Sequence, residues 1–307
     1  MIASIHFGKN KTLFSIIEKT DVAFCLHYLN SLENTIDLND LYSETAANFI
    51  SEFSTIVEKY KTDISSFFVA IDTEYSIITK VPGNIDLQSS EFVDLINLEI
   101  KQNYPDKSID DFRIKTTEII STVSQNNMYL AVIISNELIY SIENMMANFE
   151  IKVTDINASQ FSAINTLLYN YPDVSCATNI IVNINGDLLE YAIIGNRKII
   201  GYEFNLLDEN TDISSVIESK ISSIVRDIGI EDLDGIYFFG QDLEKARYLK
   251  CWEAGMLIGK EAKRLNPFRL FKTDFEKRDF EYCARTFHTY AVCIGGALPI
   301  QFPVVVR

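Results

Sequence analysis

Two short segments of the chain carry residues that could do chemistry. The first is HFGKNKT at 6–12, and the second is NING at 183–186. Lys9 or Lys11 could meet an anion, but Asn183 lacks the charge that holds a hard divalent cation through its water shell. The simpler interpretation is that Gly8 and Gly186 serve hairpin turns, because a turn needs glycine whether or not an anion binds. We favour this second interpretation.

Each of these segments belongs to a run of three short apolar stretches. The stretches are 2–7, 13–17 and 22–29 in the first run, and 180–184, 188–194 and 199–204 in the second. Asn-Gly and Gly-Asn pairs supply the positive φ angles of tight hairpins, so the second run predicts three antiparallel strands, and the first repeats its pattern. Two copies of one unit indicate an internal duplication.

A helix and a further strand are predicted after each run. Apolar residues recur at helical spacing in 42–60 and in 213–228, and short apolar stretches follow at 67–71 and 236–239. Three antiparallel strands, a helix and a strand that returns to the same sheet are typical of a ribonuclease-H-like unit. Two such units facing each other form the actin-like ATPase fold. We therefore expect an α/β protein with this duplicated fold.

Residues 76–155 are not explained by the duplication. Their pattern predicts β-α-β-β-α-β, and about 80 residues are enough for an independent small α/β lobe inserted in the first half. The expected division is a first ribonuclease-H-like half at 1–75, the inserted lobe at 76–155, a helix returning to the first half at 156–175, a second half at 176–284, and a C-terminal helix and tail packing on the first half at 285–307.

Composition argues against several functional classes. The 307-residue chain has a net charge of −16, which disfavours nucleic acid and anionic membrane surfaces. No segment approaches the roughly 18–20 apolar residues of a membrane span, and polar residues at 9–11 interrupt the apolar N-terminal stretch, which argues against a signal peptide. No CxxC or HxxxH spacing predicts a metal site. We expect a soluble, cytoplasmic protein.

The order of elements and three motifs resemble the PilM family of actin-like proteins. The motifs are TDINASQFSAINTLL at 154–168, NPF at 266–268 and YAVCIGGAL at 290–298. Members of this family serve type IV pilus assembly and are related to the cell-division actin homologue and to the cytoplasmic domain of the type II secretion L subunit. The resemblance implies a nucleotide between the two halves. It also implies a short segment of an inner-membrane partner bound at the inserted lobe and the adjacent cleft.

The nucleotide motifs of that family are altered here. Its first phosphate loop reads Asp-x-Gly, but His6 stands in place of the Asp, and the second loop reads Asn183-Ile184-Asn185. Phosphoryl transfer depends on a metal and on positioned charge, so we expect no ATPase activity and no bound ATP or magnesium. The resemblance places a degenerate nucleotide cleft at His6, Gly8, Lys9, Lys11, Thr12, Asn183, Asn185, Gly186, Gly240 and Gln241.

The inserted lobe offers residues for a partner. A hydrophobic groove where the lobe meets the first half could be lined by Ile77, Ile78, Val81, Phe92, Leu95 and Ile96. The alternative is that these side chains form the lobe's own core. The resemblance implies that such a groove receives an extended segment of a membrane-anchored protein, by strand addition or by apolar anchors. The β-prone tail at 302–307 could also add an edge strand to a sheet, since Pro303 would confine it to an edge.

Three functions remain open from the sequence. The favoured one is a nucleotide-independent cytoplasmic scaffold of a pilus or secretion apparatus, held at the inner face of the inner membrane through its partner. An active actin-like ATPase or sugar-kinase relative would need acidic residues elsewhere to replace His6 and Asn183. A polymerising cytoskeletal element is the third, and homo-oligomers are possible under each.

Overall fold

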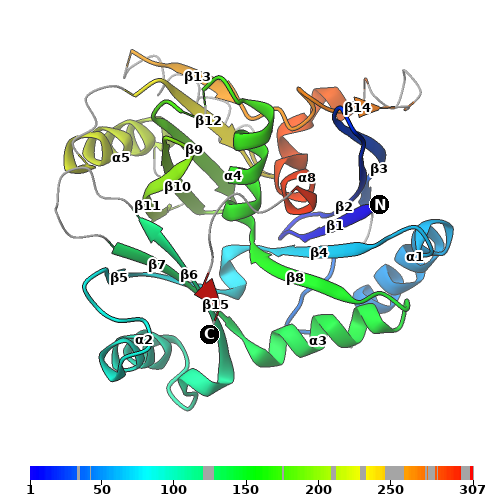
Figure 1. The fold of residues 1–307 in the computed structure, drawn as a ribbon, viewed down its shortest axis with the longest axis horizontal. Coiled ribbons are helices and arrows are strands. Elements are labelled where there is room, and N and C mark those ends of the chain that lie inside the picture. Colours follow the sequence, from blue (N-terminus) through cyan, green and yellow to red (C-terminus); the bar gives the residue numbers. More distant parts are fainter. Residues whose placement is uncertain are drawn as a thin grey trace.

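The part of the chain that a computed structural model describes contains three β-sheets with helices between and around them (Figure 1). The described residues are 1–32, 35–41, 43–119, 128–174, 176–208, 212–228, 233–245, 259–273, 275, 281, 283–298 and 305–306. Within these ranges, no helix combines the length and the apolar character needed to cross a bilayer.

The first two sheets repeat one topology. In the first half, β1 (Ile2–Phe7), β2 (Thr12–Lys19) and β3 (Phe24–Leu32) form an antiparallel meander, α1 (Glu44–Tyr60) follows, and β4 (Ser66–Ile71) pairs parallel with β1. In the second half, the same order is taken by β9 (Asn179–Asn185), β10 (Leu188–Gly195), β11 (Lys198–Leu206), α5 (Ile213–Ile228) and β12 (Gly235–Phe239). The duplication and both meanders predicted from the sequence are confirmed.

Local sequence explains where these elements begin and turn. The Ser43 side chain accepts a hydrogen bond from the Ala46 N–H and caps α1, whose buried face packs Phe49 and Phe53 against β1 and β2. The turn between β10 and β11 has positive φ at Asn196 and Arg197, and the turn after β9 has φ of +59° at Gly186. Positive φ at turn positions matches the tight hairpins that the Asn and Gly residues predicted.

The inserted lobe is built around the third sheet, in the strand order β15-β6-β7-β5. Its elements are β5 (Ile77–Pro82), α2 (Ser90–Asn103), β6 (Phe112–Ile119), β7 (Met128–Ser135) and β15 (Val305–Val306). Helix α2 covers one face of the sheet with Phe92, Ile96 and Ile100, all of which are buried against β6 and β7.

Two elements expected in the lobe belong to the first half. The predicted closing strand at 150–155 appears as β8 (Val153–Ala158), which pairs parallel with β4 in the first sheet. It takes the place that β13 (Glu261–Arg264) takes beside β12 in the second half, because each half needs a fifth strand there. Helix α3 (Asn136–Ala147) likewise buries Ile139, Ile142 and Met146 in the core that contains Phe53 of α1.

Two helices lie between the sheets of the halves. The apolar residues of α4 (Ser159–Asn170) pack on the first half's sheet, as expected, since Ile164 and Leu167 share a cluster with Ala70 of β4. The same cluster also contains Ile181 of the second half's sheet. Helix α8 (Ala291–Ala297) packs on β1 and β2, as predicted for the C-terminal helix. A Cβ on Gly295 would lie 1.8 Å from the Ser162 carbonyl oxygen, so α8 and α4 approach at a distance that requires glycine.

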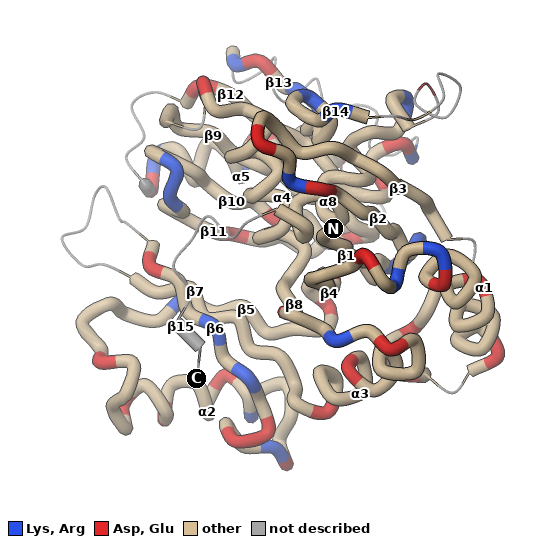
Figure 2. Tube along the Cα trace, turned by 45° about the vertical axis from the view of Figure 1, so that its right-hand side comes forward, with Lys and Arg blue, Asp and Glu red and all other residues tan. Residues whose placement is uncertain are grey.

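The remaining short elements lie at edges and connections. They are β14 (Lys272–Thr273), which pairs parallel with β3, and the 3-10 helices η1 (Thr73–Tyr75), η2 (Ile109–Asp111) and η4 (Phe287–Tyr290). Lysines and arginines gather along β13 and β14 (Figure 2), where ion pairs join Lys263 to Glu261 and Arg264 to Glu244, each at 2.8 Å. The tail was expected on the first half, but its strand β15 pairs with β6 of the lobe because β6 offers a sheet edge there.

Candidate functional site

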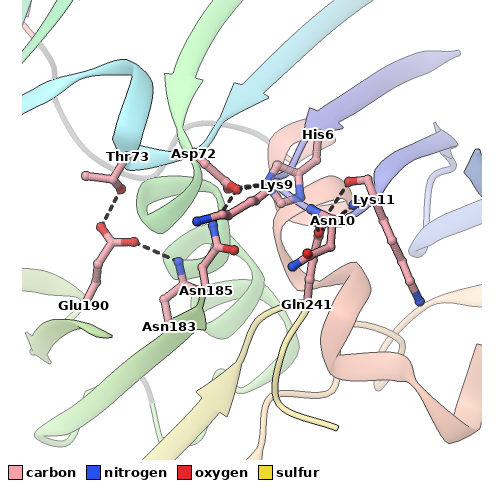
Figure 3. Close-up of polar contacts among 10 residues, drawn as sticks. All are labelled: His6, Lys9, Asn10, Lys11, Asp72, Thr73, Asn183, Asn185, Glu190 and Gln241. Carbon is pink, nitrogen blue, oxygen red and sulfur yellow. Dashed lines mark hydrogen bonds and ion pairs between the residues drawn. The ribbon is translucent and has the colours of Figure 1, made fainter. Parts of the chain in front are cut away.

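The altered phosphate-loop positions meet where the two halves face each other (Figure 3). The first half supplies His6 and the β1–β2 turn at 8–11, and the second half supplies the β9–β10 turn and the segment 240–242 that follows β12. The structure therefore brings together most of the cleft residues expected from the sequence. Thr12 is fully buried at the start of β2, paired with Phe7, and the Lys11 side chain points away from Asp72 and Asn185.

Asp72, directly after β4, joins the two turns. Its Oδ1 lies 2.8 Å from Nε2 of His6, and its Oδ2 accepts hydrogen bonds from the Lys9 N–H at 2.9 Å and from the Asn185 side-chain amide. The Asp72 residue is only 2% exposed, so these contacts compensate a carboxylate removed from solvent. Asp72 could have been predicted from the sequence, because it directly follows β4, which pairs parallel with β1. Ligand sites of α/β folds lie at the carboxyl ends of such strands.

Gln241 holds the first turn from the opposite half. Its Oε1 accepts hydrogen bonds from the N–H groups of Asn10 at 3.1 Å and Lys11 at 2.8 Å, and its Nε2 donates to the Lys11 carbonyl at 2.7 Å. A Cβ on Gly8 would lie 2.1 Å from Nε2 of Gln241. Gly8 does not adopt a positive φ, so a side chain at this position would be opposed by the Gln241 amide and not by the turn conformation.

Asp242 holds the second turn. Its Oδ2 accepts a hydrogen bond from the Gly186 N–H at 2.6 Å, and its Oδ1 accepts from the Asn10 side-chain amide at 2.8 Å and lies 2.7 Å from Nζ of Lys245. Gly240 precedes it with φ of +123°, where a Cβ would lie 2.2 Å from the Ile184 carbonyl oxygen. Asp242 is 1% exposed and was missed from the sequence, although its two preceding residues were included.

Glu190 of β10 is a third carboxylate buried between the halves. Its Oε1 accepts hydrogen bonds from the hydroxyls of Thr73 and Tyr202, each at 2.6 Å, and its Oε2 accepts from the Asn183 amide at 2.8 Å. Burial raises the pKa of the Glu190 carboxyl, and the three hydrogen bonds oppose that rise. Asn183, which stands at the altered Asp position, therefore supports Glu190.

The backbone N–H groups of the two hairpin turns are hydrogen-bonded to side chains of the protein itself. The backbone N–H groups of Lys9, Asn10, Lys11 and Gly186 all donate to side-chain oxygens of this chain. Three of these four bonds, those from Asn10, Lys11 and Gly186, cross from one half to the other or join the second half's loops. Hydrogen bonds of Asp72, Gln241 and Asp242 therefore connect the two halves.

The residues predicted to line a partner groove do not share one surface. Val81, Phe92 and Ile96 are buried in the lobe's own core, and Ile77 and Leu95 pack against that core. Ile78 lies on the opposite face of the sheet and packs against the cores between the lobe and the halves. These six residues therefore do not line one groove, because α2 covers the face of the lobe's sheet opposite to Ile78, and most of them form the lobe's own core.

Hollows do exist on both faces of β6. A cavity of about 30 Å³ toward the first half is lined by residues that include Thr117, Leu130 and Phe161. A larger hollow of about 750 Å³ on the α2 side is lined by residues that include Ile85, Phe92, Ile114 and Tyr129.

Lys115 of β6 ties the lobe to the first half beside the smaller cavity. Its Nζ donates to Oδ1 of Asp155 at 2.5 Å, to the Ile156 carbonyl at 2.6 Å and to Oδ1 of Asn157 at 2.9 Å, all on β8. Burial lowers the pKa of the Lys115 ammonium, and Asp155 opposes that change.

Comparison with solved structures shows the fold. The chain is similar to a structure described as the PilM-PilN type IV pilus biogenesis complex, with a TM-score of 0.67, 11% identity, and coverage of 96% of this chain and 97% of that chain. It is also similar to a Bacteroides thetaiotaomicron protein of actin-like ATPase fold and unknown function, with a TM-score of 0.51, 10% identity, and coverage of 87% and 91%. No protein-family model and no curated protein sequence matches. The chain has the actin-like ATPase fold, as the sequence predicted.

Proposed function

We propose that this protein is a nucleotide-independent scaffold of an assembly apparatus of the PilM type, and that it binds a short segment of an inner-membrane partner. The main observation behind this proposal is that Asp72, Gln241 and Asp242 accept hydrogen bonds from the backbone N–H groups of the two hairpin turns. The halves are held in register by the protein itself. A scaffold of this kind needs no ligand to close.

These contacts do not fit a nucleotide phosphate. A phosphate at the second turn would have to displace the Asp242 carboxylate from the Gly186 N–H, and at the first turn it would meet Gln241 and Asp72. Like charges at hydrogen-bonding distance repel each other strongly in a site with little solvent, because the effective dielectric constant is low there. His6 and Asn183 also supply no carboxylate oxygen for magnesium.

The partner half of the proposal is supported by the structural likeness. One similar solved structure is described as the PilM-PilN type IV pilus biogenesis complex, and 97% of the matched chain is covered. We infer that the lobe is the partner-binding part, because it is the part that the duplicated halves do not need for their own sheets. The protein would then work at the cytoplasmic face of the membrane that anchors its partner.

Nucleotide independence is tested by thermal unfolding with and without magnesium and ATP. A ligand at 100 times its Kd stabilises a fold by about 2.7 kcal/mol, which raises Tm visibly. We expect the Tm of the intact protein to stay constant up to millimolar ATP. A magnesium-dependent rise in Tm, or release of phosphate above the buffer rate, would show an active actin-like ATPase instead.

Partner binding is tested by co-purification. The tagged protein is expressed with a single-span membrane protein encoded beside it, and the complex is extracted in mild detergent. We expect retention of that membrane protein, and loss of retention when its short cytoplasmic segment is deleted. Failure to retain any such protein would contradict this half of the proposal, and sedimentation of long polymers would favour a cytoskeletal element.

A further inference from the structure

Three polar side chains meet where the lobe joins the first half. Lys115 lies on β6 of the lobe, and Asp155 and Asn157 lie on β8, at the edge of the first half's sheet. Asp155 and Asn157 are two positions apart on their strand, so their side chains point to the same side of it. Lys115 is only 6% exposed, and its Nζ lies 2.5 Å from Oδ1 of Asp155 and 2.9 Å from Oδ1 of Asn157. An amine, a carboxylate and a carboxamide are therefore held together at this junction.

Asp155 bridges the other two side chains. Its Oδ1 accepts a hydrogen bond from Nζ of Lys115, and its Oδ2 accepts one from Nδ2 of Asn157 at 3.0 Å. An ion pair needs only the first of these contacts. The second contact places the nitrogen of the carboxamide beside the carboxylate that can take a proton from the amine. A general acid–base group must lie within hydrogen-bonding distance of the atoms between which it moves a proton, and Asp155 meets that condition on both sides.

The surroundings of Lys115 favour its neutral, nucleophilic form. Burial lowers the pKa of the Lys115 ammonium, Asp155 opposes that change, and the charge of Arg113 acts in the same direction as burial. Removal from water is one way in which a lysine becomes a nucleophile. The cavity of about 30 Å³ on this side of β6 is lined by both Lys115 and Asn157. A cavity of that size can hold a molecule as large as water, so a leaving ammonia has a space beside the reacting groups.

We propose that Lys115 and Asn157 form an intramolecular isopeptide bond that joins the lobe to the first half. Asp155 accepts a proton from the Lys115 ammonium, and the neutral Nζ attacks Cγ of Asn157, which forms a carbon–nitrogen bond. Asp155 then gives its proton to Nδ2 of Asn157, the Cγ–Nδ2 bond breaks with its electron pair on nitrogen, and ammonia leaves. The carboxylate takes a second proton from Nζ, which becomes an amide nitrogen with one hydrogen. The Asp155 side chain is 23% exposed and releases that proton to solvent.

The isopeptide bond adds a covalent connection between the lobe and the first half. The chain already connects them through η1, between β4 and β5, and at the passage from β7 to α3. The reacting groups belong to one chain and are held in contact, and such intramolecular reactions gain a large effective concentration. The reaction uses no cofactor and no second enzyme. This inference does not depend on the proposed partner, because it concerns only residues of this chain.

The unmodified full chain is sufficient for the test. Its mass is measured at high resolution after unfolding in acid, which breaks non-covalent contacts but leaves amides intact. We expect a mass lower by one ammonia molecule than the mass of the sequence. Trypsin should fail to cut after Lys115, because an amide nitrogen carries no charge, and should release 114–152 joined to 153–197. A protein of full mass that trypsin divides after Lys115 would overturn the inference. Loss of water instead of ammonia would also overturn it, since the acceptor would then be a carboxyl group and not Asn157.

Three variants test the role of each group. Lys115→Arg keeps a cation but removes the nucleophilic amine, and Asp155→Asn keeps both reacting groups but removes the proton carrier. Each should have the full mass of its own sequence. The matched control is Lys80→Arg, because Lys80 is another lysine of the lobe that forms an ion pair, with Glu203. The control should still lack one ammonia. Loss of ammonia from Asp155→Asn would contradict the role of Asp155 in the reaction.

Urea unfolding supplies a readout that an ion pair alone does not change. A cross-link between residues 115 and 157 keeps part of the unfolded chain compact, so it lowers the m value, which reports the surface exposed on unfolding. We expect a higher m value for Lys115→Arg than for the unmodified protein and for Lys80→Arg. Loss of the ion pair without a cross-link would shift only the midpoint, so equal m values for the three proteins would count against the isopeptide bond.

Discussion

Asp242 accepts a hydrogen bond from the backbone N–H of Gly186. Its neighbour Gln241 does the same for the first turn, with both atoms of its side-chain amide. Backbone N–H groups at turns are the kind of group that binds phosphate in many proteins. Sequence reasoning found Gly240 and Gln241 through a resemblance, but it missed Asp72, Asp242 and Glu190. Asp72 lies 66 residues from His6, so the contact could be inferred only from the predicted strand pairing, which places the ends of β1 and β4 side by side.

Removing the charge of Asp242 should weaken the fold. Asp242→Asn replaces one acceptor oxygen by an amide that donates, so at least one of Gly186 N–H, the Asn10 amide or Lys245 loses its acceptor. An unsatisfied buried donor costs about 1–3 kcal/mol. We expect a loss of that size in urea unfolding. Asp106→Asn, at an exposed position, is the control, and equal stability of the two variants would contradict the role assigned to Asp242.

Glu190 should make stability depend on pH. Burial raises the pKa of its carboxyl in the folded state above that in the unfolded state, so its stabilising contribution is complete below the unfolded pKa and is lost as pH rises through the folded pKa. Glu190→Gln removes this dependence and keeps Oε1 as an acceptor for Thr73 and Tyr202.

The measurement is urea unfolding of both proteins from about pH 4.5 to pH 7.5. We expect the stability of Glu190→Gln to gain on the unmodified protein as pH rises, by about 1.4 kcal/mol for each pKa unit by which the folded carboxyl is raised. Parallel pH profiles would show that Glu190 is not perturbed. Glu91→Gln changes an exposed carboxyl and should give such a parallel profile.

At the scale of elements, periodicity predicted which faces are buried but not which neighbours they meet. The apolar residues of α4 are buried as their spacing indicated, and they pack on Ala70 of the first half's sheet as expected, but also on Ile181 of the second half's sheet. The strand at 153–158 was expected from its sequence, but it extends the first sheet instead of the lobe's. A strand pattern has no information about its partner, because any parallel edge offers the same backbone groups. The internal duplication does contain this information, because the pairing of β8 with β4 could have been predicted from the pairing of β13 with β12.

Helix α2 allows a sharp test of the lobe's core. Phe92 is 1% exposed, whereas Leu98 on the same helix is 58% exposed. Phe92→Ala removes a buried ring and should cost about 3–5 kcal/mol, while Leu98→Ala should be nearly neutral. Limited proteolysis should show cleavage within 76–119 in the first variant only. Similar resistance of both variants would mean that the lobe does not depend on this core.

At the scale of the whole molecule, the two halves are joined by side chains as well as by helices. Helices α4 and α8 lie between the sheets, and Asp72, Gln241 and Asp242 fasten the facing turns. A protein whose two halves close on a ligand gains the energy of closure from that ligand. Here the equivalent contacts are permanent parts of the chain, so the relative position of the halves should not respond to nucleotide.

Small-angle scattering and hydrogen exchange test this rigidity. We expect the radius of gyration of the unmodified protein to be the same with and without magnesium and ATP. Gln241→Ala/Asp242→Ala removes the hydrogen bonds from Asn10, Lys11 and Gly186, and should speed amide exchange in the turns at 8–11 and 185–188. The control is Arg226→Ala/Asp227→Ala, another pair of adjacent residues, whose ion pair lies exposed on α5 within the second half. If the cleft double variant exchanged as slowly as this control, the helices alone would hold the halves together, and the turn contacts would contribute little to closure.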